Sequence, residues 1–556
     1  MDGWFYCKLF QQMNASALRY NIIITIGAFL LFVPFLGSVH LFDWDEINFA
    51  ECAREMLVTH DYFSVKINYQ AFWEKPPIFI WMQALSMSLF GITEFAARLP
   101  NALCGIVTLI VIFNIGRRLV DERFGLLWVL AYAGSFLPHF YFKSGIIDPW
   151  FNLFIFCGIY YFILFSNNKN TRALIFSALF IGLGVLTKGP VAVLVIGLCV
   201  VTFWMLKRFQ SIINSKQIII YALTVACVGG LWFLMLALTG HVSIIKEFFL
   251  YQVRLFNTQD SGHGGPFFYH LIVLMIGCFP LSIFALRGFR RSSFDTPYQK
   301  HFKLWMMILF WVVLILFSIV KTKIVHYSSL CYFPMSFLAA YSIYKLISGE
   351  LKWKKSTGIL LMSIASIIGI VISALPVIDK YKQQIIDSDL INDKFAVENI
   401  KATVSWTGVE WLIGVILIVG VGAMLVIIKQ GKIKWGIIGI FLFSLFAVNM
   451  ASVLVVPRIE KYSQGAAIEF YESMQGKDCY IEPVFFKSYA HLFYSKKKPQ
   501  ANANSNNSEW LLRGAIDKPA YFVSKITAVE DVKQYYPELV ELNRKNGFVF
   551  WLRSPK

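Results

Sequence analysis

Long apolar runs, separated by short polar segments, make up most of the chain before residue 457. About thirteen runs are long enough for an α-helix to cross a bilayer, which takes roughly 20 residues. Because lipid offers the backbone no hydrogen-bonding partners, these runs are expected to be helical. The predicted spans lie near 21–39, 95–116, 126–142, 147–165, 172–187, 190–206, 217–238, 268–287, 304–320, 327–347, 357–376, 410–428 and 434–453.

Three further apolar segments are too short or too amphipathic to span. They are residues 46–58, 78–90 and 243–256. In 46–58, apolar residues recur at helical spacing beside a strongly charged face. We expect all three to be helices lying in the membrane interface.

The pattern changes after residue 457. "DCYIEPVFF", "AYFVSKI" and "GFVFWLR" have the length and composition of short strands, and "AVEDVKQYYPELVEL" has helical periodicity. The sequence therefore predicts an all-α polytopic membrane domain at 1–456, followed by a small α/β domain at 457–556. Residues 377–408 are expected to form a long loop with helical pieces on the same side of the membrane as this domain.

The composition agrees with a membrane protein: 57% of the 556 residues are hydrophobic and 15% are charged. The net charge of +18 does not indicate nucleic-acid binding, because the basic residues lie in short inter-span loops, where they set topology and contact anionic lipid. Their distribution places the N-terminus in the cytoplasm. With an odd number of spans, the C-terminal domain then lies outside.

The polar residues that topology does not explain fall on the external side. They lie in "LFDWDEINFAECAREM" (41–56), "FWEKPP" (72–77), "GIIDPW" (145–150), "LTKGP" (186–190), "DSGHGG" (260–265) and "VKTKIVHY" (320–327). An interface helix usually attracts basic residues toward lipid head groups. The acidic first segment therefore indicates a functional site.

Each candidate residue also has a structural interpretation. Asp43, Asp45 or Asp148 could cap a helix, and Lys75 could extend to the interface beside Glu74. His263 could be a metal ligand, part of a lid, or neither. Lys323 and Tyr327, with neighbouring Lys321 and His326, crowd one external helix end, where basic residues favour a bound anion. Lys188 in "TKGP" gives the same signal more weakly.

Carboxylates, cations and a potential metal ligand on one side of a membrane suit chemistry on a phosphate-linked lipid. Carboxylates can act as a base or bind a metal. Cations can stabilise the charge that grows on a departing phosphate.

The motifs "DWDEINFAECAREM", "FWEKPPIFIW" and "FGITEFAARLPNAL" resemble the N-terminal half of membrane glycosyltransferases of GT-C fold. The most similar group is the lipid A aminoarabinose transferases and related polyprenyl-phosphate-sugar transferases; the protein O-mannosyltransferases are more distant. The resemblance implies a sugar donor linked to undecaprenyl phosphate and transfer with inversion. It assigns the catalytic acid to Asp45, with Glu46 beside it, and a second acid to Asp148.

The same resemblance places Lys75 and Tyr327, with Lys323, near the donor phosphate, and a divalent metal between Glu74 and His263. The sequence departs from the Asp-Glu-x-Arg-Tyr pattern of the aminoarabinose enzymes, because Asn48 and Phe49 stand where the Arg and Tyr are expected. We expect Arg54 to supply the missing positive charge at the phosphate.

The sequence thus predicts an enzyme of the bacterial inner membrane with a periplasmic active site and C-terminal domain. It is expected to transfer a monosaccharide from a polyprenyl phosphate to lipid A or another envelope glycolipid. A protein O-glycosyltransferase with the same donor is an alternative, and a lipid or sugar transporter or flippase is a second. A glycosidase-like hydrolase and a receptor are further alternatives.

Overall fold

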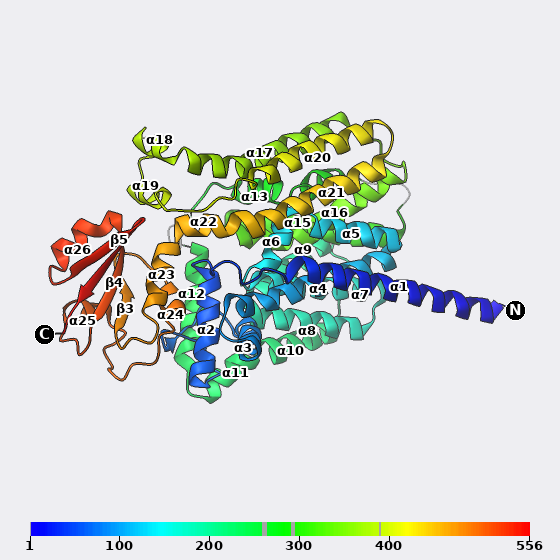
Figure 1. The fold of residues 1–556 in the computed structure, drawn as a ribbon. Helices are drawn as coiled ribbons and strands as arrows, with labels where there is room; N and C mark the ends of the chain where they lie inside the picture. The colour runs from blue at the N-terminus through cyan, green and yellow to red at the C-terminus, as the bar shows by residue number, and fades with distance from the viewer. Residues whose placement is uncertain (1, 258–263, 291–294, 389–390, 556) are drawn as a thin grey trace.

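The computed structural model describes residues 2–257, 264–290, 295–388 and 391–555. Most helices run side by side in one bundle, with a small sheet at one end of it (Figure 1). Within the described residues, nine helices are long and apolar enough to cross a membrane, or up to eleven if two bent pairs each count as one. The outer faces of helices such as α17 expose large apolar side chains, among them Ile370 and Val371. The chain is a multi-pass membrane protein.

The spans follow the predicted apolar runs. They are α1 (Asp2–Phe32), α4 (Glu94–Leu119), α7 (Asp148–Asn168), α8 (Thr171–Lys188), α15 (Pro297–Ile319), η3 with α16 (Val325–Cys331, Tyr332–Ile347), α17 (Lys355–Lys380), α20 (Trp411–Lys429) and α21 with η4 and α22 (Ile433–Met450, Ala451–Val455, Val456–Ser463).

Some predicted spans are not continuous helices. Residues 217–238 form α10 (Ser215–Gly229) and α11 (Leu231–Leu238), which meet at 54°, and 268–287 form α13 (Tyr269–Gly277) and α14 (Leu281–Gly288), which meet at 112°. Pro280 lies in the second break, where a proline removes a helical hydrogen bond. Residues 126–142 divide into α5 (Glu122–Ala133), α6 (Phe136–Phe140) and η1 (Tyr141–Lys143), and 190–206 form the short α9 (Val191–Leu206).

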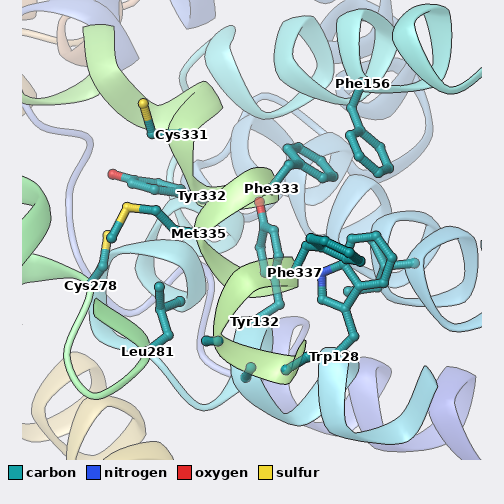
Figure 2. Close-up of a cluster of buried hydrophobic side chains, with 14 of the residues drawn as sticks. Trp128, Tyr132, Phe156, Cys278, Leu281, Cys331, Tyr332, Phe333, Met335 and Phe337 are labelled. Carbon is teal, nitrogen blue, oxygen red and sulfur yellow. The ribbon is translucent and has the colours of Figure 1, made fainter. Parts of the chain in front are cut away.

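Aromatic packing fixes α16 in the middle of the bundle (Figure 2). Phe333 stacks on Phe156 with 4.3 Å between ring centroids, and Phe337 meets Trp128 at 5.2 Å. The Trp128 indole N–H donates to Ser336 Oγ at 2.9 Å. Such dense contacts leave α16 little room for movement. Because η3 leads directly into α16, the position of η3 is fixed as well.

The three short amphipathic segments are helices, as predicted: α2 (Asp45–Thr59), α3 (Ile78–Phe90) and α12 (Val242–Asn257). Helix α2 runs across the end of the bundle, between the bundle and the C-terminal domain (Figure 1). Its expected position at the lipid interface is wrong, because every residue from Glu46 to Met56 is buried. A small antiparallel pair, β1 (Lys66–Ile67) and β2 (Gln70–Ala71), follows it.

The C-terminal domain has a four-stranded sheet in the order β3-β4-β6-β5. The β3–β4 pair is parallel and the other two pairs are antiparallel. The three predicted strands are confirmed as β3 (Tyr480–Pro483), β4 (Ala520–Lys525) and β6 (Phe548–Arg553). The predicted helix through residue 542 is too long: α26 (Val529–Tyr535) ends before Pro537, and β5 (Val540–Lys545) follows.

The remaining short elements connect these parts. They are α18 (Lys382–Asp387), α19 (Lys394–Ile400), α23 (Gly465–Ser473), α24 (Ala490–Tyr494), α25 (Ser508–Arg513) and η5 (Ile526–Ala528). One hydrophobic cluster contains Ile47 and Phe49 of α2 together with Phe493 of α24 and Phe550 of β6. The C-terminal domain is therefore packed directly on α2.

Candidate active site

A cavity of about 780 Å³ lies where α2, the 72–77 loop, α7, α12, η3 and the C-terminal domain meet. Its walls include five acidic side chains and two lysines from the membrane part of the chain. These are Asp43, Asp45, Glu46, Glu74, Asp148, Lys75 and Lys188. Residues far apart in the sequence thus meet in one cavity, among them the predicted Asp45, Lys75 and Asp148.

The carboxylates of Asp45 and Asp148, the Lys188 ammonium and the His326 imidazole form a continuous row across the cavity. Lys188 Nζ lies 2.7 Å from Asp148 Oδ1. His326 Nε2 lies 3.8 Å from Asp148 Oδ2 and 3.3 Å from Asp45 Oδ2. The Asp148 side chain is 4% exposed, whereas that of Asp45 is 31% exposed. Asp45 is therefore the accessible end of this row of charged and polar groups.

Helix ends explain why these charges lie here. Asp45 and Asp148 are the first residues of α2 and α7, where the helix dipole favours negative charge, and Pro149 suits the first turn of α7. Lys188 is the last residue of α8, where a cation is favoured. Neither α2 nor α7 begins with a side-chain cap hydrogen bond in the described structure. The capping interpretation of Asp43 and Asp148 is therefore not supported.

Gly189 completes the turn after α8. Its φ of +87° belongs to the region that favours glycine, and the Phe248 ring would lie 2.6 Å from an added Cβ. The glycine thus lets the chain turn under α12 and keeps Lys188 at the cavity wall.

Lys75 is the second cation of the cavity. Its Nζ lies 3.9 Å from Glu74 Oε2 and 5.1 Å from the centre of the Tyr251 ring. The Tyr251 hydroxyl donates to the same Glu74 oxygen at 3.0 Å. Burial lowers the pKa of Lys75, and the Glu74 and Asp45 carboxylates partly oppose that shift. A buried ammonium with so distant a partner is suited to binding an anion.

Apolar and aromatic side chains form the rest of the cavity. Phe151, Val191, Val195, Phe317 and Leu330 line it from the membrane part. The C-terminal domain adds Phe486, Lys487 and Lys525, and α2 is preceded by Trp44, whose ring lies 4.8 Å from Lys487 Nζ. The cavity therefore combines an apolar wall with charged groups, as a substrate with a lipid tail and a polar head requires.

Glu46 has a structural position rather than the expected catalytic one. Arg98 binds it through two bonds, Nε to Oε1 at 3.0 Å and a terminal nitrogen to Oε2 at 2.8 Å. The backbone N–H groups of Phe42 and Gly145 also donate to it. Burial would raise the pKa of Glu46, but the Arg98 guanidinium holds it below its ordinary value. With both oxygens occupied, this carboxylate joins two loops of the site.

Arg54, which was predicted to lie at the donor phosphate, does not line the cavity. Arg54 lies nine residues after Asp45, which is two and a half helical turns, so it points to the opposite side of α2. There it binds Glu51 at 2.7 and 2.6 Å and donates to the Lys497 carbonyl at 2.9 Å. The residue connects α2 to the C-terminal domain.

Lys323 is also placed away from the cavity. Its ammonium group donates to the carbonyls of Phe317, Ser318 and Val320, at 3.0, 2.6 and 2.6 Å. Basic side chains commonly satisfy the free carbonyls at the end of a helix, here α15. Tyr327, by contrast, lines the cavity, with Lys188 Nζ 5.0 Å from its ring centre.

His263 lies outside the described residues. Among the residues that the structure does describe, no group of three or more His, Cys, Asp or Glu side chains could hold a metal ion. Glu74 is in the cavity and could supply one oxygen ligand.

The sequence marked two further residues of the site without giving them a role in catalysis: His326, which stood among external cations, and Lys188, which gave a weaker form of the same signal. It missed three others entirely. Tyr251, Lys487 and Lys525 had no motif around them, and only the docking of α12 and the C-terminal domain brings them to the cavity.

Comparison with known proteins gives consistent matches. A family model described as dolichyl-phosphate-mannose-protein mannosyltransferase matches residues 74–234. The undecaprenyl phosphate-α-4-amino-4-deoxy-L-arabinose arabinosyl transferase of Shewanella sediminis is 24% identical over 370 residues, covering 65% of this chain and 67% of that protein. The transferase of the same name from Edwardsiella ictaluri is 28% identical over 330 residues, covering 57% and 58%. The matches thus leave a third or more of each relative uncovered.

The fold matches over nearly the whole chain. The crystal structure of ArnT from Cupriavidus metallidurans bound to undecaprenyl phosphate has a TM-score of 0.73 at 16% identity, covering 97% of this chain and 99% of that one. The apo structure of the same enzyme has a TM-score of 0.71.

These matches define the chain as a polytopic membrane protein with the GT-C fold of glycosyltransferases, as its motifs predicted. Enzymes named as undecaprenyl phosphate-linked aminoarabinose transferases are among the proteins similar to it in sequence, and ArnT is similar to it in fold.

Proposed function

We propose that the protein is an inverting glycosyltransferase that moves a monosaccharide from undecaprenyl phosphate to lipid A or another envelope glycolipid. The observation that carries the proposal is the cavity that joins a partly exposed carboxylate, two largely buried ammonium groups and an apolar wall. The relatives named for undecaprenyl phosphate-linked aminoarabinose transfer support it.

The donor phosphate is assigned to Lys75 and Lys188. In the reaction, the bond between the anomeric carbon and the phosphate oxygen breaks and leaves its electron pair on the phosphate. Ammonium groups held in a buried site stabilise that growing charge more strongly than water would. The lipid chain extends along Phe151, Val191 and Phe317.

Asp45 acts on the acceptor. The acceptor oxygen forms the new bond to the anomeric carbon on the face opposite the departing phosphate. If that oxygen belongs to a hydroxyl, its proton passes to Asp45. If it belongs to a phosphate that is already ionised, Asp45 orients it.

The C-terminal domain is assigned to the acceptor side. Lys487 and Lys525 line the cavity from this domain, opposite the membrane part that supplies Lys75. An acidic acceptor would find its counter-charges there.

The divalent metal expected between Glu74 and His263 remains a separate proposal, and no step above depends on it. Treatment of the purified protein with a chelator tests it. Loss of transfer that Mg²⁺, Mn²⁺ or Zn²⁺ restores supports a metal requirement, and unchanged transfer contradicts it.

The orientation is also proposed from sequence. The positive-inside rule places the N-terminus in the cytoplasm, so the cavity and the C-terminal domain face the periplasm of the bacterial inner membrane. Labelling of an introduced cysteine at exposed Lys498 by an impermeant reagent in intact spheroplasts tests this, and labelling only after lysis contradicts it.

Transfer itself is tested with the purified full chain in nanodiscs. Undecaprenyl phosphate carrying either aminoarabinose or a hexose is supplied with lipid A, and the products are analysed by mass spectrometry. We expect lipid A to gain one sugar while an equal amount of undecaprenyl phosphate is released. Release of free sugar without transfer would indicate a hydrolase, and movement of intact donor would indicate a flippase.

A protein acceptor is the second candidate. It is favoured by the match of residues 74–234 to the protein mannosyltransferase model. Envelope proteins and envelope lipids from cells with and without the gene distinguish the two, because only one fraction should lose the mass of a sugar.

A further inference from the structure

His326 enters the cavity between the two carboxylates of the site. It belongs to η3, which leads directly into the tightly packed α16, while Lys323 holds the preceding turn against the end of α15. The side chain is 13% exposed, so its position is set by protein rather than by solvent.

Its Nε2 atom faces oxygens of both Asp45 and Asp148, at 3.3 and 3.8 Å. An ionised carboxylate accepts hydrogen bonds and cannot donate them. A bare imidazole nitrogen between two such oxygens would be repelled by both. Nε2 therefore carries a hydrogen and points it at the carboxylates.

The two carboxylates depend on His326 to different degrees. Asp148 is nearly buried and has Lys188 at 2.7 Å. Asp45 is 31% exposed, and in the part of the chain that the structure describes its one ion-pair partner is His326. The histidine thus matters most for the carboxylate that faces the acceptor.

We propose that His326 is a positioning residue that holds Asp45 ionised and oriented toward the acceptor. This rests on the proposed transferase function. An N–H aimed at a carboxylate fixes its direction and favours its charged form. The Lys188–Asp148 pair in turn limits where the imidazole can move.

The site has other charges whose effects must be separated from that of His326. The groups that face its ring are Asp45 of α2, Asp148 of α7, Lys188 of α8, Lys75 of the 72–77 loop and His270 of α13. All of them are present in each variant below, so a change in the Asp45 titration reports the loss of the imidazole.

The experiment compares His326→Ala, His326→Gln and the wild-type protein in nanodiscs. The alanine variant lacks any N–H, whereas glutamine retains one. We expect His326→Ala to lose about tenfold to a hundredfold in kcat/KM, as for a lost charge-assisted hydrogen bond. The acid limb of its pH profile should move to higher pH, and His326→Gln should recover part of both. His241→Gln, at an exposed position outside the cavity, is the matched control.

A second readout needs no turnover. Infrared difference spectra against Asp45→Asn follow the protonation of the Asp45 carboxyl directly. We expect protonation at higher pH in His326→Ala than in the wild type. An unchanged Asp45 titration overturns the proposal, even if activity falls. If the Asp45 titration moves in His326→Ala but the wild type transfers no sugar, the proposed function fails, and only the effect of His326 on the Asp45 carboxylate remains.

Discussion

Helix α2 has two charged faces that resemble each other in sequence and differ in structure. On the cavity face, Asp45 is partly exposed, and its one ion-pair partner among the described residues, His326, lies 3.3 Å away. On the opposite face, Glu51 is fully buried and is held by Arg54 at 2.6 and 2.7 Å. Arg54 and Tyr69 also donate to the Lys497 carbonyl.

The difference teaches how one acidic segment can serve two purposes. A carboxylate whose hydrogen bonds are all made by the protein has none left for a substrate. A carboxylate with one long contact in an open cavity can still bind one. The acidic residues therefore divide into a face for chemistry and a face that attaches the C-terminal domain, and each prediction below acts on one face.

The largest effect is expected on the domain face. Arg54→Met should lower the free energy of unfolding by about 3–5 kcal/mol, because it leaves the Glu51 charge buried without its partner. Thermal unfolding in detergent measures this. Arg513→Met, which breaks an exposed pair with Glu509, should cost less than about 1 kcal/mol. If Arg54→Met instead weakens donor binding without changing the Tm, Arg54 is a phosphate ligand after all.

The next effect concerns Glu55, on the same face. Burial, with the nearby Glu51 carboxylate, raises the pKa of Glu55 to about 9 from an ordinary value of 4.5. The folded protein then keeps a proton that the unfolded chain has lost. Stability should therefore fall as pH rises toward about 9, by at most about 1.4 kcal/mol per pH unit.

Unfolding measurements between pH 7 and 9 check this. Glu55→Gln keeps an oxygen for the Tyr69 N–H but cannot ionise, so it should flatten the pH dependence. Glu530→Gln, at an exposed position in α26, should leave the slope unchanged. A slope that is equally steep in Glu55→Gln assigns the pH dependence to another group.

On the cavity face, Lys75→Met should raise the KM for the lipid-linked donor by about tenfold to a hundredfold, as for a lost charge-assisted contact. The KM for the acceptor should change little. Lys246→Met, an exposed lysine on α12, is the control. Burial lowers the pKa of Lys75, so this side chain should lose its charge at a pH below the ordinary lysine pKa of about 10.4. Donor binding by the wild type should weaken as pH rises through that range. An unchanged donor KM in Lys75→Met contradicts the assignment.

The smallest effect is expected at the side of the cavity that the C-terminal domain lines. Lys487 is exposed, so Lys487→Met should raise the acceptor KM by no more than about fivefold, equivalent to about 1 kcal/mol. Lys498→Met, exposed in the loop before α25, should not. If Lys487→Met raises the donor KM instead, the acceptor and donor sides have been exchanged.

The features that could be predicted from the sequence are those set by the order of apolar and polar residues along the chain. Apolar length identified the spans, and charges on the external side identified Asp45, Lys75, Asp148 and Tyr327 as cavity candidates. The break at Pro280 was readable in principle, but hydropathy alone does not distinguish a bent pair of helices from one span.

The sequence did not predict where individual charged side chains point or which groups they bind. The helical phase that separates Arg54 from Asp45 was present in the sequence, but the docking of the C-terminal domain on that face of α2 was not. Lys323 looked like an anion ligand because its carbonyl partners at the end of α15 carry no sequence signal. Lys487 and Lys525 reach the cavity only through tertiary docking.

The most direct test of the account is sugar transfer by Asp45→Asn, compared with Asp531→Asn at an exposed position in α26. Purified proteins in nanodiscs receive the undecaprenyl phosphate-linked donor and lipid A, and the product is measured per folded molecule. We predict that Asp45→Asn loses a factor of about 10²–10⁴ while its Tm is unchanged, and that Asp531→Asn behaves as the wild type. Transfer at the wild-type rate by folded Asp45→Asn would contradict the assignment of the cavity face to catalysis.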